Sequence, residues 1–341
     1  MVPSRDVGDV TQLLGDGNAI DPTLLDRLRA EARAAAAGSY SPNTLRARHA
    51  DLTQWVRWCA ARYDTPLPAR PEVLAEFIQA MRAAPHARQP ATIRRYVDTI
   101  AYVHRAAGIP DLRATRPVQL ALRALQRTSM RGRQASAITE AHIQQILAVL
   151  GDTSRDRRDC ALLLTTADLL GRCGEVVALQ FEDLVPGTAG KGLLLIRRIK
   201  TGPDPIPKAV RRRTFRALQT YVAAAGIQSG PLFRSLTRNG RVRDRALHAN
   251  EVGRILRRLM IRAGLSSDGV SGHSLRVGMA QELVAKGATL PQVMDAGDWK
   301  SPAMPARYAE RLTAERSAVI TLLADDEYDI AYERSSAHGL R

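Results

Sequence analysis

The sequence predicts a mainly α-helical protein of two domains with one small β-sheet. Three observations lead to this class. The 341 residues exceed the usual size of a single domain. From Thr23 onward, apolar residues recur at helical spacing almost without interruption. The clearest strand pattern, Leu193–Ile196, is followed by the turn 201–205 and a second short strand near Ile206.

The first domain is expected to be entirely helical and to span residues 22–127, after a loose polar N-terminus of residues 1–21. Ser41 before Pro42 is typical of a helix start, and Pro71 suits a first helical turn. Trp55 and Trp58 lie beside an apolar stripe and are interpreted as core residues rather than a binding platform. The helices of this domain are predicted at 22–37, 42–62, 71–84, 90–107 and 115–128.

A polar, basic segment at 128–137 is interpreted as a linker to a larger α+β domain at 138–325, which a tail at 326–341 follows. The 156–170 helix is so rich in leucine that it is expected to be buried on nearly all sides. Pro302 and Pro305 predict that the helix carrying Tyr308 begins only at about Pro305. The helices of this domain are predicted at 139–150, 156–170, 212–225, 248–264, 273–286, 290–297, 303–311 and 314–324.

Composition points to a polyanionic partner. The formal net charge is +16, and positive surfaces of this strength attract phosphates, although an arginine-rich genome would also raise it. Aromatic residues make up only 4%, which favours duplex DNA over single strands that stack on rings. The three cysteines, Cys59, Cys160 and Cys173, form no metal-ligand or disulfide pattern, so we expect no metal and a reducing cytoplasm. No apolar run approaches the ~20 residues that span a membrane.

Four short motifs carry residues with chemical potential. The segment 171–175 places Arg172 and Glu175 three residues apart, a spacing that alone indicates an ordinary ion pair. Lys200 stands beside the hairpin turn. The segment 271–276 holds a histidine and an arginine at helical spacing, and 297–308 places a tryptophan nine residues before a tyrosine. No single motif supports a function.

In this order and with these spacings, the motifs together resemble the active site of the tyrosine recombinases, the phage integrase family. The resemblance extends from about residue 40 to 325. It assigns a catalytic set of seven residues: Arg172, Glu175, Lys200, His273, Arg276, Trp299 and Tyr308.

The resemblance implies that Tyr308 attacks the scissile phosphate and holds the 3′ phosphate covalently. Arg172 and Arg276 would clamp the non-bridging oxygens, with no metal and no cofactor. His273 would assist proton transfer at the tyrosine hydroxyl, and Trp299 would pack and donate a hydrogen bond from its indole N–H.

Lys200 is informative on its own. Only five of the 50 basic residues are lysines. An ammonium can release a proton and a guanidinium cannot, so a general acid suits this position. An incidental lysine is the alternative, and it applies equally to Lys191 and Lys208. Glu175 would orient neighbouring basic groups.

The resemblance also implies a clamp of two domains around duplex DNA with inverted half-sites. The 90–96 segment corresponds to a helix in the major groove, and Arg95 is expected to contact guanine. Arg46 and Arg48 are expected to contact phosphates. The complete set of predicted DNA contacts is Arg46, Arg48, Thr92, Arg94, Arg95, Tyr96, His248 and Asn250.

Assembly is expected through the C-terminal helix 314–324, with Thr313 as its cap and Glu315 in its first turn. Its apolar face would dock into a neighbouring protomer and link four copies in a ring. A helix folded back on its own domain is the alternative. The apolar positions are Ala318, Val319, Leu322 and Leu323.

Two other functions use the same features. A type IB topoisomerase shares the nucleophile and the arginines, but its tyrosine usually follows a long linker, whereas Tyr308 lies only 32 positions after Arg276. A non-catalytic DNA-binding regulator would have no use for the seven residues. The sequence therefore favours a simple recombinase of phage, plasmid or mobile-element origin.

Overall fold

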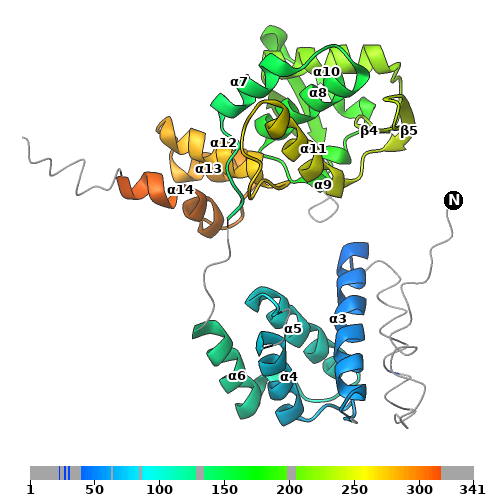
Figure 1. The fold of residues 1–341 in the computed structure, drawn as a ribbon, viewed down its shortest axis with the longest axis vertical. Coiled ribbons are helices and arrows are strands. Elements are labelled where there is room, and N and C mark those ends of the chain that lie inside the picture. The colour runs from blue at the N-terminus through cyan, green and yellow to red at the C-terminus, as the bar shows by residue number, and fades with distance from the viewer. Residues whose placement is uncertain are drawn as a thin grey trace, which may run out of the picture. The chain divides into compact units, whose positions relative to one another are not determined.

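The computed structural model describes residues 23, 27, 30, 40–62, 64–83, 87–127, 134–197 and 205–315. The chain divides into two compact units, Met1–Arg133 and Gln134–Arg341 (Figure 1).

The described part of the first unit is helical. Proline occupies the first position of three of its helices, where the missing N–H has no partner to lose. Ser41 caps the first of them, since its Oγ accepts a hydrogen bond from the Thr44 N–H at 3.2 Å. The elements are α3 (Pro42–Ala60), α4 (Pro71–Ala83), α5 (Pro90–Ala106), the 3-10 turn η2 (Leu112–Ala114) and α6 (Arg116–Arg127).

Aromatic side chains form the core of this unit. Trp55 is 1% exposed, and its ring meets Phe77 edge-on at 5.1 Å between centroids. Trp58 stacks on Trp55 at 5.8 Å and is partly buried against the same cluster. The prediction that both tryptophans are core residues is confirmed.

The second unit alternates helices with two small antiparallel sheets. Its elements are α7 (Glu140–Val149), α8 (Ser154–Leu169), α9 (Cys173–Val177), η3 (Phe181–Asp183), β1 (Leu184–Pro186), η4 (Thr188–Gly190), β2 (Gly192–Ile196), β3 (Ile206–Val210), α10 (Arg212–Ala225), β4 (Arg234–Leu236), β5 (Val242–Ala246), α11 (Ala249–Arg262), α12 (Ser274–Ala285), α13 (Leu290–Gly297) and α14 (Ala303–Glu315).

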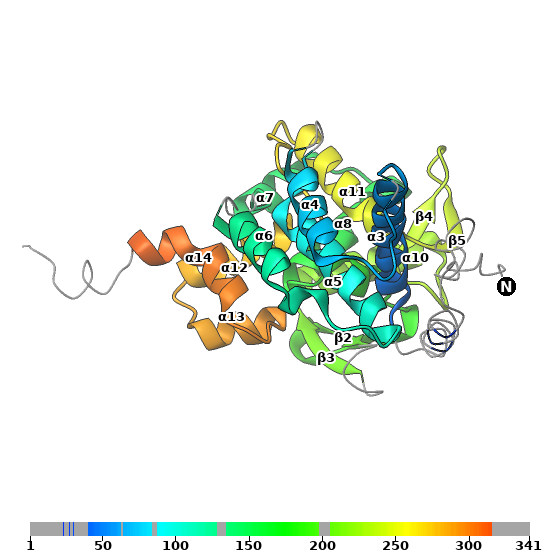
Figure 2. The same cartoon turned by 90° about the horizontal axis from the view of Figure 1, so that it is seen from below.

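The sheets are larger than the sequence predicts. The predicted strands β2 and β3 pair with each other, with Leu194 opposite Lys208, and β1 adds a third strand. The β4–β5 hairpin forms a separate two-stranded ribbon (Figure 2). Neither β1 nor this hairpin was predicted from the sequence, because both β4 and β5 carry arginines and none of the three alternates apolar with polar residues. The predicted class, mainly α with a small β component, is confirmed.

Helix α8 is the central element of the second unit. Its segment Ala161–Ala167 is buried without interruption, as the leucine-rich sequence predicts. The helix ends at Leu169, and its C-cap residue Leu170 adopts the left-handed conformation with φ of 44°. Few residues other than glycine take this conformation, so the surroundings must hold it in place.

Part of the predicted linker belongs to the second unit. The Ser136 N–H donates to the Gly269 carbonyl at 3.0 Å, and the Ile138 N–H donates to the Ser274 carbonyl at 3.0 Å. A Cβ at Gly278 would lie 2.0 Å from the Ile138 oxygen, so only glycine allows α12 to lie this close to the segment. Residues 128–133 of the predicted linker lie outside the described residues.

Two predictions about α14 are wrong. The helix begins at Ala303, as the predicted range 303–311 has it, and not at Pro305, where the two prolines placed its start. Pro305 is tolerated there because the first helical N–H groups have no intrahelical partner, and the Ala306 N–H donates to the Pro302 carbonyl at 2.9 Å. The helix then continues through Thr313 to Glu315, so Thr313 does not cap a separate helix. Residues 316–324 of the predicted assembly helix lie outside the described residues.

Among the described residues, no helix is long and apolar enough to cross a membrane.

Candidate active site

Arg276 is the centre of the candidate site. It lies in the first turn of α12 and is 3% exposed. Its Nη1 donates to the Leu170 carbonyl, and its Nη2 donates to the Gly297 carbonyl at 2.6 Å. Leu170 is the C-cap residue of α8 and Gly297 is the last residue of α13, so one guanidinium joins three helices through carbonyls that helix ends leave free.

Trp299 packs against this guanidinium. The Arg276 Cζ lies 4.0 Å from the centroid of the ring, a favourable cation–π distance. The chain reaches Trp299 through Asp298, which has φ of 54°, and the Trp299 N–H donates to the Met294 carbonyl at 3.0 Å. A Cβ at Gly297 would lie 2.0 Å from the indole ring, so the close turn requires glycine at this position.

The electrostatics of Arg276 connect it to the other catalytic candidates. Burial, and after it the charge of Arg172, lower the pKa of its guanidinium to about 10. The charges of Glu175, Tyr308 and Asp298 act in the opposite direction. Arg276 remains protonated at pH 7, so two positive groups lie within electrostatic reach of each other and of Tyr308.

Arg172 is the N-cap residue of the short helix α9 and immediately precedes it. Its Nη1 donates to Glu175 Oε1 at 2.7 Å, and its backbone N–H donates to Glu175 Oε2 at 3.1 Å. The predicted i,i+3 pair is therefore present. The Arg172 side chain is 50% exposed, so much of its guanidinium faces solvent and is free to meet a ligand.

Tyr308 lies on α14 beside Trp299. The two rings meet edge-on with centroids 5.9 Å apart. Gln281 of α12 donates from its Nε2 to the Tyr308 carbonyl at 3.0 Å, which ties the two helices together at this residue. The tyrosine ring is partly buried against the main core of the unit.

His273 lies at the entrance of α12, and its side chain is exposed. Its backbone N–H donates to Ser271 Oγ at 3.2 Å. The preceding Gly272 leaves no room for a side chain, because a Cβ there would lie 2.4 Å from Cys173 Sγ. The histidine loop is thus packed directly against α9, the helix of Arg172.

The structure therefore brings together most of the predicted catalytic set: Arg172, Glu175, Arg276, Trp299 and Tyr308, with His273 on the adjoining loop. Lys200 lies outside the described residues. In the part of the chain that the structure describes, no three His, Cys, Asp or Glu side chains are grouped as a metal site.

The contacts of Lys208 were not predicted from the sequence. This residue of β3 is only 16% exposed, and its Nζ lies 2.9 Å from Asp298 Oδ2. It also donates to the Ala296 carbonyl at 2.9 Å, at the C-terminal end of α13 where a positive charge is favoured. Lys208 thereby holds the turn that presents Trp299. The scarcity of lysine was the available signal, but the sequence could not connect β3 with α13.

Arg95, the predicted guanine contact, is held by a buried carboxylate in the first unit. Asp51 is 1% exposed and accepts from Arg95 Nε at 3.0 Å and Nη2 at 2.8 Å. Thr99 donates to the same carboxylate, to Asp51 Oδ2 at 3.0 Å. The hydrogen bond and charge of Asp51 raise the pKa of Arg95, although burial opposes them. The Arg95 side chain is 52% exposed, and these bonds to Asp51 use its Nε and Nη2 rather than its Nη1.

The other predicted contacts on α5 differ in exposure. Arg94 is exposed and Thr92 is half-buried at the start of the helix. Tyr96 is 7% exposed and packs against Phe77 at 5.9 Å, which favours a core role over the predicted DNA contact.

Of the two arginines predicted to contact phosphates, Arg46 is exposed and bonds Asn43. Arg48 lies between two rings, with its Cζ 4.0 Å from the Tyr40 centroid and 3.5 Å from that of Tyr102. This arrangement favours a packing role for Arg48.

The predicted contacts at the start of α11 are His248 and Asn250. His248 is exposed and caps the helix, since its Nδ1 accepts from the Asn250 N–H at 3.2 Å. The His248 N–H in turn donates to Glu251 Oε2 at 3.0 Å. His248 therefore has a structural role that was not predicted from the sequence.

Comparison with known proteins identifies the family. Residues 136–315 match the family model described as the phage integrase family, which is more than half of the chain. The chain is 24% identical to the recombinase cre of Escherichia phage P1, over 85% of this chain and 90% of that protein. It is 28% identical to an integrase/recombinase xerD homolog of Selenomonas ruminantium, over 84% of this chain and 86% of that protein.

Solved structures share the fold. The XerH recombinase in a post-cleavage complex with palindromic difH substrate aligns at a TM-score of 0.61 and 17% identity, covering 91% of this chain and 92% of that one. The Tn1549 transposon integrase bound to transposon right end DNA aligns at a TM-score of 0.60 and 14% identity, covering 91% and 99%. The chain belongs to the phage integrase family, the tyrosine recombinases.

Proposed function

We propose that this protein is a site-specific recombinase that breaks and rejoins duplex DNA through a covalent bond between Tyr308 and a 3′ phosphate. The observation that carries the proposal is the grouping of Arg276, Trp299 and Tyr308. The guanidinium lies 4.0 Å from the indole centroid, and the tyrosine ring meets the same indole at 5.9 Å. A nucleophile thus stands beside a permanent positive charge, which is what cleavage of a phosphodiester requires.

The chemical step conserves the phosphodiester energy. The Tyr308 Oη attacks the scissile phosphorus and loses its proton to His273, while the bond from phosphorus to the 5′ oxygen breaks. The leaving 5′ oxygen takes a proton from Lys200. A 5′ hydroxyl then attacks the phosphotyrosine, displaces Tyr308 and restores the backbone. When this hydroxyl belongs to a second site, the strands are exchanged.

Arg172 and Arg276 have different roles at the phosphate. Arg172 is half exposed and can place its planar fork on the non-bridging oxygens. Arg276 donates one N–H of each Nη to a backbone carbonyl. It therefore offers the phosphate a positive charge in a fixed position and the N–H groups that these two bonds leave over. These charges stabilise the phosphorane, and we propose that neither a metal nor a nucleotide is needed.

The arrangement of Arg95 supports its predicted role as a guanine contact. Asp51 holds the Nε and Nη2 edge of the guanidinium, which leaves the Nη1 end for the two acceptors of a guanine. A buried carboxylate that fixes the arginine beforehand reduces the entropy lost on binding.

Assembly is proposed to follow the pattern of four copies on two sites, each with inverted half-sites, joined through the apolar positions of the segment 316–324 that follows α14. A lambda integrase has been solved as a dimer bound to a COC′ core site, and its chain aligns at a TM-score of 0.56 and 16% identity, covering 83% of this chain and 94% of that one. Removing residues 316–341 should leave binding to one half-site intact and abolish cooperative filling of a paired site.

Trapping of the covalent intermediate tests the proposed function. Tyr308→Phe should bind DNA like the wild type but form no protein–DNA adduct on a denaturing gel. Tyr221→Phe serves as the matched control, because Tyr221 belongs to the same unit but lies in its core and is 1% exposed. The Tyr221→Phe variant should therefore still form the adduct. An adduct of undiminished yield from Tyr308→Phe would refute the assignment.

A further inference from the structure

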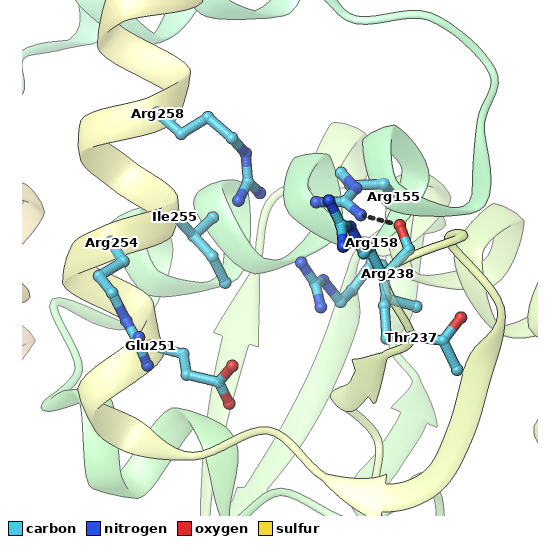
Figure 3. A pocket seen from close by; sticks show the side chains of 9 residues that line it. Arg155, Arg158, Thr237, Arg238, Glu251, Arg254, Ile255 and Arg258 are labelled. Atoms are coloured by element: carbon cyan, nitrogen blue, oxygen red, sulfur yellow. Dashed lines mark hydrogen bonds between the residues drawn. The ribbon is translucent and has the colours of Figure 1, made fainter.

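Outside the candidate active site, the second unit has a cavity of about 450 Å³ surrounded by arginines. It lies between the first turns of α8, the turn of the β4–β5 hairpin and one face of α11 (Figure 3). Five arginines and one carboxylate, Glu251, are among its lining residues. The cavity is here called the arginine pocket, and its arginines are Arg155, Arg158, Arg238, Arg254 and Arg258.

Two of these arginines are fixed by one buried carboxylate. Asp159 is 1% exposed and accepts from Arg158 Nε at 2.9 Å and Nη2 at 2.6 Å. Its second oxygen accepts from Arg258 of α11. The pair of guanidiniums shares a single negative charge, so this part of the pocket keeps a net positive charge whose position is set by the core.

The other three arginines have no carboxylate partner among the described residues. Within the described part of the chain, Arg155 donates only to the Arg238 carbonyl, at 3.4 Å, and this bond connects the hairpin turn to α8. Arg238 and Arg254 line the opening from the hairpin turn and from α11. Figure 3 shows side chains from both elements around the same opening. Like charges gathered from three elements repel one another unless an anion lies between them.

We propose that the arginine pocket binds a phosphate group. Guanidinium forks match phosphate oxygens in geometry and keep their charge at any physiological pH. The cavity volume accommodates a phosphate with its neighbouring atoms. The phosphate could belong to the DNA backbone, and in that case the proposal rests on the proposed function. A free polyphosphate would supply the same chemistry.

The pocket is separate from the catalytic group. Arg155 lies in the first turn of α8, and Leu170, which accepts a hydrogen bond from Arg276, follows the last turn of the same helix. Fifteen residues of helical rise correspond to about 22 Å. One phosphate cannot reach both places, so a DNA phosphate in the pocket would lie outside the scissile position.

The first experiment uses inorganic pyrophosphate as the probe. Isothermal titration should show binding to the full-length wild type and at least about tenfold weaker binding to the double variant Arg155→Ala/Arg238→Ala, which removes charge-assisted hydrogen bonds. The control is Arg243→Ala/Arg245→Ala, which removes two exposed arginines of the same hairpin outside the pocket and should bind as the wild type does. Thermal unfolding of all three proteins checks that they fold.

The second experiment uses a duplex chosen by selection from a randomised pool. Neutral methylphosphonates replace its phosphates one at a time. If the pocket holds a backbone phosphate, a methylphosphonate at one particular phosphate, distant from the cleavage site, should lower the affinity of the wild type and of the control about tenfold. The same replacement should leave the affinity of the pocket variant unchanged.

The outcomes separate the sources and the hypotheses. Loss of pyrophosphate binding without a coupled backbone position assigns the pocket to a free polyphosphate. Equal behaviour of the pocket variant and the control in both experiments overturns the proposal, and a Tyr308 adduct would then still support the proposed recombinase function. If no duplex binds, the proposed function fails while the pyrophosphate titration still decides the pocket.

Discussion

The guanidinium of Arg276 lies 4.0 Å from the centre of the Trp299 ring, and both residues donate hydrogen bonds to backbone carbonyls of α13, Arg276 from its side chain and Trp299 from its backbone N–H. Under the proposed function, this contact would make the tryptophan part of the charge environment of the scissile phosphate. Trp299→Phe keeps a ring face under the guanidinium and should lower the rate of adduct formation less than Trp299→Ala does. We expect the alanine variant to lose about 2 kcal/mol of transition-state stabilisation, or roughly 30-fold in rate. Single-turnover cleavage measures both rates, and equal rates would exclude a role for the ring.

Lys208 should act on the reaction through the turn that it holds. Lys208→Met removes the 2.9 Å ion pair with Asp298 and the bond to the Ala296 carbonyl. We expect adduct formation to fall about tenfold while DNA affinity changes little, because the substitution frees the chain around Trp299. Lys191→Met removes an exposed lysine of the same unit and serves as the control. Parallel losses in both variants would indicate a general effect of charge.

Lys200→Arg should stop cleavage although the charge is kept, because a guanidinium does not release its proton. A substrate with a 5′-bridging phosphorothiolate should restore the rate, since sulfur leaves without a donated proton. Gel analysis of adduct yield on both substrates measures this rescue. A variant that stays inactive on the sulfur substrate would transfer the general-acid role to another group.

Asp51→Asn should reduce the selectivity of DNA binding more than its strength. The substitution removes the buried charge that holds the Nε and Nη2 edge of Arg95. Selection from a randomised duplex pool should show one guanine preference weakened in Asp51→Asn and lost in Arg95→Ala, a change worth about 1–3 kcal/mol. Arg94→Ala, which removes the exposed neighbour, should instead weaken all sequences alike. An unchanged guanine preference in Arg95→Ala would exclude the predicted base contact.

Glu140 should make the second unit sensitive to acid. Burial raises the pKa of this carboxyl, but hydrogen bonds from Arg213, Arg211 and Gln144 outweigh it and hold the pKa at about 2, against an ordinary value of 4.5. A carboxyl with a lowered pKa stabilises the folded state above its unfolded pKa, and this stabilisation is lost as the pH falls toward 2.

Glu140→Gln should therefore lower the free energy of unfolding at pH 7 by about 2 kcal/mol, after allowance for its partial exposure. The difference from wild type should shrink as the pH falls from the ordinary value of 4.5 to about 2. Asp152→Asn, at a carboxylate that is 95% exposed, should change neither quantity. Urea unfolding at several pH values measures both, and a difference that does not vary with pH would contradict the ion-pair explanation.

The residues of each segment were sufficient to predict most helices, the mainly helical class and the resemblance that the family match confirms. Helical periodicity is local, so α3, α5 and α8 could be predicted from their own residues. The order and spacing of the motifs are also properties of the chain alone, and they were sufficient to select the arginines, the tryptophan and the tyrosine.

Tertiary packing, in contrast, decides which residues surround these motifs. Lys208 meets Asp298, and Asp51 meets Arg95, across 90 and 44 positions of sequence respectively. The continuation of α14 past residue 311 also emerged only from the structure. Pro302 precedes the helix and Pro305 lies in its first turn, where a proline is tolerated. Contacts between distant segments depend on how helices and strands pack, and the periodicity of each segment contains no information about its neighbour.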